Sequence, residues 1–183
     1  MMVRLFAAFP IMGTIAQSFS KIAQINSGLS DIRWTPEINF HITLFFIGEV
    51  QENNVISVLE QLTTVRSKMK PFQLNFDQFV VKRKGNKPVM IWAQWKKNDA
   101  FRHLHKLIME TVSEFMTISV SHQDPIPHCT LARIKNKTGD MELNLEGLVP
   151  EEVILIDRAE LWRTNQSKSG IRYECLGSFA FVK

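Results

Sequence analysis

Two copies of the pattern His-x-Thr-Leu occur in the chain, at residues 41–44 and 128–131. The first lies in the apolar run FHITLFFIGEV and the second in PHCTLARIK. The chain contains only 5 histidines in 183 residues, so a shuffled sequence of this composition would rarely contain the pattern even once. Two copies therefore indicate a repeated structural unit with a shared role.

The spacing of each motif predicts that its histidine and threonine share one face of a strand. Successive side chains of a β-strand point to opposite faces, so His41 projects with Thr43 and His128 projects with Thr130. Cys129 points away from His128, and the two adjacent residues cannot form a nucleophilic Cys-His dyad. Each motif should therefore present one imidazole and one hydroxyl to the same side.

Two imidazoles and two hydroxyls suit acid and base chemistry at a phosphate. An imidazole titrates near pH 6.5, so one histidine can accept a proton while the other donates one. The hydroxyls of Thr43 and Thr130 can donate hydrogen bonds to non-bridging phosphate oxygens. In-line displacement at phosphorus needs the attacking and leaving oxygens on opposite sides, as two motifs facing across a cleft would provide. One motif alone is equally consistent with a hydrogen-bonded histidine on a half-exposed strand, whereas the pair favours catalysis.

The elements around the motifs predict an α+β fold with antiparallel sheets. Apolar residues at helical spacing predict helices from Pro10 to about Asn26, over 55–69 and over 101–115, the last capped by Asn98 or Asp99. Strand-like runs cover residues 3–9, both motifs, 72–81, 88–95, 151–164 and 171–181. The basic segment KRKGNK predicts a hairpin turn with Gly85 and Asn86 at its tip. Strands and helices do not alternate strictly, which argues against a parallel sheet.

Composition predicts one soluble domain over residues 1–183, present as a cytoplasmic monomer. Hydrophobic residues make up 45% of the chain and charged residues 22%, and the net charge of +4 is compatible with anionic partners. Two cysteines are too few for a disulfide framework. The start imitates a secretory signal, but Pro10 interrupts its apolar run. No run of about 18 apolar residues is present, so no membrane contact is expected.

Three segments carry a family resemblance: RLFAAFP at 4–10, RWTPEINFHITLFFIGEV at 33–50 and HCTLARI at 128–134. They resemble the two-histidine (2H) phosphoesterases, most closely the RNA 2',3'-cyclic phosphodiesterase branch, which is also described as 2'-5' RNA ligase-like. The resemblance implies a bilobal fold of two antiparallel sheets with outer helices. Its pseudo-twofold halves would each give one His-x-Thr strand to a central cleft. It also implies hydrolysis of RNA or nucleotide 2',3'-cyclic phosphates to terminal 2'-phosphates.

The resemblance further assigns roles to single residues. It implies that His41 is the proton donor and His128 the proton acceptor. Members of the branch use the residues five after each histidine, here Phe46 and Arg133, to contact base and phosphate. Strict alternation points both side chains away from the cleft, so a bulge or a strand end would have to turn them inward.

Three functions stay open at this point. The leading one is a metal-independent RNA 2',3'-cyclic phosphodiesterase; a second is 2'-5' phosphodiester hydrolysis or ligation in the same cleft. The third is non-catalytic binding of RNA ends. The sequence has no Gly-rich phosphate loop, zinc-type Cys/His spacing or carboxylate cluster, so neither a metal nor a cofactor is expected. His103 and His105 would face different directions on a helix, which predicts solvated side chains rather than a metal pair.

Overall fold

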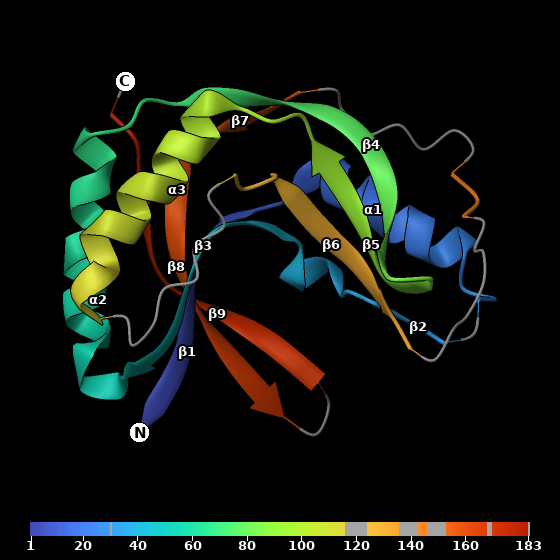
Figure 1. Ribbon diagram of the computed structural model, residues 1–183, viewed down its shortest axis with the longest axis horizontal. Helices are drawn as coiled ribbons and strands as arrows, with labels where there is room; N and C mark the ends of the chain where they lie inside the picture. Colours follow the sequence, from blue (N-terminus) through green and yellow to red (C-terminus); the bar gives the residue numbers. More distant parts are fainter. Residues whose placement is uncertain (30, 116–123, 136–142, 146–152, 168–169, 183) are drawn as a thin grey trace.

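The computed structural model describes residues 1–29, 31–115, 124–135, 143–145, 153–167 and 170–182 (Figure 1). Its strands are β1 (Met2–Pro10), β2 (Ile32–Trp34), β3 (His41–Gln51), β4 (Phe72–Lys84), β5 (Lys87–Trp95), β6 (His128–Ile134), β7 (Val153–Ile156), β8 (Arg158–Ser167) and β9 (Gly170–Ala180). Its helices are α1 (Gly13–Ile25), α2 (Val55–Thr63) and α3 (Asp99–Val112). The strands pair in the order β7-β4-β5-β6-β3-β1-β8-β9, with β2 beside β6, and every pairing is antiparallel.

The two motif strands are neighbours at the middle of this path. In the described part of the chain, β3 and β6 are joined by one residue pair, Ile42 opposite Cys129. From β3 the path continues through β1 and β8 to β9, and from β6 it continues through β5 and β4 to β7. The α+β class and the antiparallel pairing are thus confirmed, and the two expected sheets are linked into one path. The bilobal shape stays a prediction.

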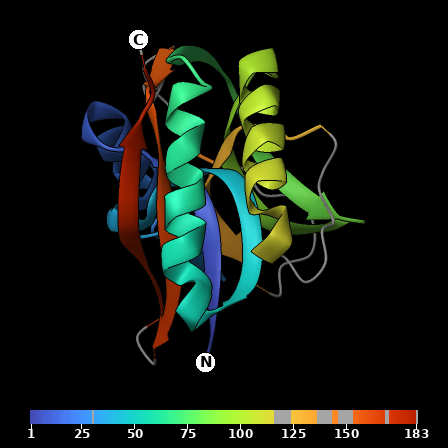
Figure 2. The ribbon, with the colours of Figure 1, turned by 90° about the vertical axis from the view of Figure 1, so that its left-hand side faces the viewer.

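Different helices cover the two groups of strands on either side of the motif pair. Phe19 of α1 packs its ring edge-on against Phe79 of β4 and Trp95 of β5. Helices α2 and α3 stand side by side over the other group of strands, where they contact β9 and β3 (Figures 1 and 2). Leu59 of α2 packs closely on Gly177 of β9, since a Cβ atom on this glycine would lie 2.5 Å from Leu59 Cδ1. Helices therefore cover the strands on both sides of the motif pair.

Two local predictions are confirmed. Gly85 and Asn86 form the tip of the β4–β5 hairpin, where Gly85 has a φ of 58°, a value that favours glycine. Asn98 caps α3, because its Oδ1 accepts a hydrogen bond from the Phe101 backbone N–H at 3.0 Å.

Helix boundaries differ from the expected ones. Pro10 does not begin a helix: it ends β1, opposite His41 of β3, and α1 starts at Gly13. Strand pairing thus extends β1 past the point where sequence pattern placed the helix. The second and third helices end as α-helix at Thr63 and Val112, and each continues as a 3₁₀ turn.

Candidate active site

The two motif strands have the same pattern of burial over their first seven residues. In both, the histidine and the threonine are half-buried, and the residue between them is fully buried. His41, Thr43, His128 and Thr130 all line one cavity of about 360 Å³. The structure therefore brings the four predicted groups together on one face, with the intervening residues in the core.

The strand register determines which residues of the two motifs lie opposite each other. Because Ile42 lies opposite Cys129 in an antiparallel pair, His41 is level with Thr130, and Thr43 is level with His128. Each histidine thus borders the threonine of the other motif. Cys129 itself is fully buried, and burial raises the pKa of its thiol to about 12, in agreement with the exclusion of a Cys-His dyad.

Main-chain hydrogen bonds select the same tautomer in both histidines. The Nδ1 atom of His41 lies 2.7 Å from the carbonyl oxygen of Asn39, and Nδ1 of His128 lies 2.8 Å from that of Ile126. In each case the carbonyl oxygen lies two residues earlier in the chain. A carbonyl can only accept, so Nδ1 must carry the proton and donate it. This leaves Nε2 of both rings as the nitrogen that can take or give a proton.

His41 sits among three aromatic rings. The centroids of Phe6, Trp162 and Tyr173 lie 5.1, 5.2 and 5.1 Å from that of the His41 ring. Burial lowers the pKa of His41 to about 4, the hydrogen bond to Asn39 opposes this shift, and His128 adds to it. His41 is therefore neutral at pH 7 in the free protein. A donor role requires a negative charge in the cavity to raise this pKa, and a bound phosphate supplies one.

His128 stacks on one large ring. Its imidazole lies 3.6 Å from the Trp92 ring, centroid to centroid, with 16° between the planes. The Lys82 ammonium lies over the same indole at 4.6 Å. Burial lowers the pKa of His128, the hydrogen bond to Ile126 opposes the shift, and the Lys82 charge adds to it. His128 is thus also neutral at pH 7, which suits a proton acceptor.

Matching bulges turn Phe46 and Arg133 into the cavity. The register of β3 against β1 skips Leu44, because Ala8 pairs with Thr43 and Ala7 with Phe45. The register of β6 against β5 skips Leu131 in the same way. One extra residue reverses the alternation, so the fifth residue after each histidine returns to the cleft face. Phe46, 54% exposed, and Arg133 both line the cavity, and the bulge that their roles required is present in both strands.

His105 supports the first bulge. Its Nδ1 lies 2.8 Å from the carbonyl oxygen of Leu44, the extra residue in β3, and its ring packs edge-on against Phe45 at 5.0 Å. The expectation that His105 is a solvated surface residue was wrong, because the helix turns its half-buried ring toward β3. His103, one of the two, is exposed as expected.

Asn39 is a site residue that sequence reasoning missed. It is buried, its carbonyl orients His41, and its side-chain Nδ2 donates to the Ile171 carbonyl at 2.9 Å. Its Oδ1 accepts from the Tyr173 backbone N–H at 3.4 Å. Asn39 therefore ties β9 to the start of β3. The only sequence signal was its position two residues before the histidine.

Known proteins resemble this chain in sequence. Residues 10–92, which include the first motif, match the family model described as LigT like Phosphoesterase. An RNA 2',3'-cyclic phosphodiesterase of Geobacillus stearothermophilus is 26% identical over 182 residues, or 97% of this chain. The chain is thus similar to the LigT-like phosphoesterases. It spans 57% of the length of the Geobacillus relative.

Solved structures share the LigT-like fold. TT0787 of Thermus thermophilus is 20% identical, with a TM-score of 0.83 over 97% of both chains. E. coli LigT, in a crystal structure with 3'-AMP, is 17% identical, with a TM-score of 0.77 over 99% of both chains. At these identities the similarity shows the fold alone.

The threonines of the two motifs provide a first test. Replacing Thr43 or Thr130 by Ala removes one hydroxyl from the cavity and should lower kcat on a cyclic phosphate by roughly 10- to 1,000-fold. Thr→Ser at each position keeps the hydroxyl and should retain most of the rate. Steady-state kinetics of the four variants measures the difference. Unchanged kinetics in both Ala variants would mean that these hydroxyls do not contact the phosphate.

The lowered histidine pKa values predict an acid-shifted pH profile. In the expected acid–base mechanism the histidine pair must hold one proton, and the pKa values of both histidines lie below 6.5 in the free protein. As pH rises above the higher of them, the pair loses that proton, so kcat/KM should peak below pH 6.5 and then fall about tenfold per pH unit. The kcat profile should extend to higher pH, because bound phosphate favours the imidazolium. An alkaline limb of kcat/KM above pH 6.5 would contradict this electrostatic account.

Proposed function

We propose that this protein hydrolyses 2',3'-cyclic phosphate ends of RNA or nucleotides to 2'-phosphates, with His41 and His128 as acid and base. The observation that carries the proposal is the matched pair of histidines, each held through Nδ1 by a main-chain carbonyl beside one cavity. The name of the Geobacillus relative, an RNA 2',3'-cyclic phosphodiesterase, and the 3'-AMP complex of E. coli LigT support the substrate class.

The reaction proceeds as an in-line displacement at phosphorus. Nε2 of His128 takes a proton from water as the water oxygen forms a bond to phosphorus. The bond from phosphorus to the 3' oxygen breaks, and Nε2 of His41 gives its proton to that oxygen. The hydroxyls of Thr43 and Thr130 donate hydrogen bonds to the non-bridging oxygens. Exchange with solvent then returns the pair to its starting protonation.

Two further side chains orient the substrate in this scheme. The exposed ring of Phe46 offers a surface on which the base can stack. The guanidinium of Arg133 offers several donors to phosphate oxygens, and it lies at the same place in its strand as Phe46. Neither contact changes protonation during the reaction, so both residues bind rather than catalyse.

The binding partner, the oligomeric state and the cellular location are also proposals. RNA ends are the expected partner, and a single-domain cytoplasmic monomer stays the prediction from composition. In the part of the chain that the structure describes, no helix is long and apolar enough to cross a membrane.

The test is turnover of an oligonucleotide that ends in a 2',3'-cyclic phosphate, in excess EDTA. The acid, the base and the oxyanion donors of the scheme are all side chains, so the expected product is a 2'-phosphomonoester at a rate unchanged by chelation. Chromatography against synthetic 2'- and 3'-phosphate standards identifies the product. Loss of activity in EDTA that Mn²⁺ or Mg²⁺ restores would contradict the proposed mechanism.

A further inference from the structure

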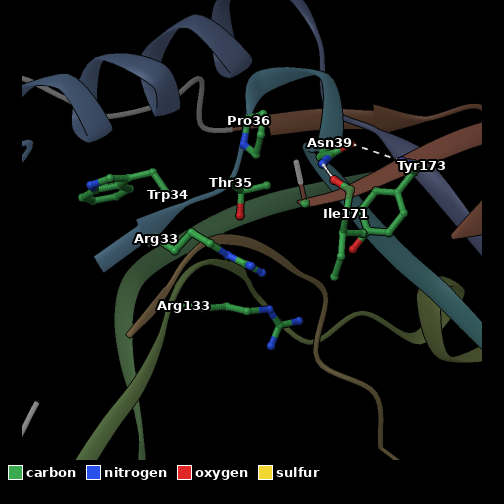
Figure 3. Close-up of a pocket in the computed structure, with 9 residues that line it drawn as sticks. Arg33, Trp34, Thr35, Pro36, Asn39, Arg133, Ile171 and Tyr173 are labelled. Carbon is green, nitrogen blue, oxygen red and sulfur yellow. Dashed lines mark hydrogen bonds between the residues drawn. The ribbon is translucent and has the colours of Figure 1, made fainter. Parts of the chain in front are cut away.

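A smaller cavity of about 250 Å³ adjoins the catalytic cavity (Figure 3). Four residues line both cavities: Thr35, Arg133, Ile171 and Tyr173. Arg33 lines only the smaller one, and the proposed reaction makes no use of it.

Two arginines face each other across this cavity. Arg33 of β2 and Arg133 of β6 are a directly opposite pair, so their side chains leave the same face of the sheet. Figure 3 shows both guanidinium groups extending into one space. Like charges directly opposite each other are unfavourable in an antiparallel pair. Among the described residues neither arginine forms an ion pair with a carboxylate, and Arg133 donates a hydrogen bond to Met90 Sδ at 3.5 Å. A bound anion would offset this repulsion.

The opposite wall adds a neutral donor. Burial raises the pKa of Tyr173, whereas the charges of Arg133 and Arg33 act to lower it, so the hydroxyl stays protonated and lies within electrostatic reach of both guanidinium groups. Asn39 holds this wall in place through the Ile171 carbonyl and the Tyr173 N–H (Figure 3). Two cations and a hydroxyl donor on a fixed wall are the groups that bind phosphate.

We propose that the smaller cavity is a second phosphate site, which holds the 5' phosphate of the nucleotide whose cyclic phosphate lies between His41 and His128. The inference rests on the proposed function and deepens it. One nucleotide carries both phosphates on one ribose, and the four residues that line both cavities place the cavities side by side. The protein then prefers ends with a phosphate upstream, as in an RNA chain, to a nucleoside cyclic phosphate with a free 5' hydroxyl. Arg33 is the residue specific to this preference.

Product binding tests the second site without requiring turnover. Calorimetric titration compares adenosine 2',5'-bisphosphate with adenosine 2'-monophosphate on the wild type, Arg33→Gln and Arg172→Gln. The last variant removes the same charge from the exposed residue between Ile171 and Tyr173, which points away from the cavity. The wild type and Arg172→Gln should bind the bisphosphate at least about tenfold more tightly, as expected for a charge-assisted contact. In Arg33→Gln the ratio should fall to within about threefold. A dinucleotide 2'-phosphate carries a phosphodiester in place of the 5' phosphomonoester. Its affinity shows whether the site accepts the phosphate that links two nucleotides or only a free 5' phosphate.

Several results would overturn the second site. One is that the wild type binds the monophosphate, the bisphosphate and the dinucleotide 2'-phosphate with equal affinity. Another is that Arg33→Gln keeps the full affinity gain for the bisphosphate over the monophosphate. The third is that none of these ligands binds. Turnover of a cyclic phosphate by the same preparations decides the proposed function separately. Turnover without an affinity gain would leave hydrolysis standing and remove the second site. An affinity gain that Arg33→Gln abolishes, without turnover, would support the site and contradict hydrolysis.

Discussion

Replacing His128 by Ala should lower kcat/KM on a 2',3'-cyclic phosphate end by about 100- to 10,000-fold, and His41→Ala should cause a loss of the same order. Each substitution removes the group that transfers one of the two protons in the reaction, and general acid–base catalysis is worth this much. Among the described residues, the other basic side chains that line the cavity are Arg4 and Arg133, and a guanidinium group has N–H donors but no acceptor. Neither can replace a lost imidazole.

The matched control is His103→Ala. His103 is exposed on α3 and lies outside the cavity, so this variant should keep the wild-type rate. Circular dichroism must show that His41→Ala and His128→Ala are folded, because each substitution also removes a hydrogen bond to a main-chain carbonyl. Full activity of either folded variant would remove that histidine from the mechanism.

The second large effect separates the roles of the two histidines. A nitrophenyl ester of a nucleotide phosphate has a good leaving group and needs little proton donation. His41→Ala should therefore recover much of its lost rate on this substrate, whereas His128→Ala should not, because water must still be activated. The measurement is the ratio of activities on the activated and natural substrates, which should be about 100-fold or more higher in His41→Ala.

The low pKa of His41 makes its assignment as the proton donor depend on the bound substrate. Burial lowers the pKa of His41 to about 4, so the residue expected to donate is neutral in the free protein at pH 7. Donation depends on the phosphate charge raising that pKa in the complex. Preferential rescue of His128→Ala by the activated ester would reverse the two roles and make His41 the base.

The core of the site could be predicted from the sequence because strand alternation is a local property. The spacing in HITL and HCTL is enough to put each histidine beside its threonine, and the burial of Ile42 and Cys129 confirms it. The direction of Phe46 and Arg133 could not be predicted this way. It depends on bulges at Leu44 and Leu131, which arise where β3 and β6 pair with strands far away in the chain.

The residues that surround the histidines could not be predicted from the sequence for the same reason. Trp92 comes from β5, Tyr173 from β9 and His105 from α3, and no spacing in the sequence links them to a motif. Tyr173 packs against His41 and Trp92 against His128, and burial is the largest cause of both histidine pKa shifts. Local pattern therefore predicted which groups face the cavity, and tertiary packing decides how readily the two histidines take up protons.

Hydrolysis in ¹⁸O-labelled water, followed by ³¹P NMR, tests most directly whether the paired motifs activate water for in-line attack on a cyclic phosphate. The account predicts one ¹⁸O atom from water in the phosphate of a 2'-phosphomonoester and none in the new 3' hydroxyl. A 3'-phosphomonoester would show that the other ester bond breaks. Label in the ribose hydroxyl would show attack at carbon, and either result would contradict displacement of the 3' oxygen at phosphorus.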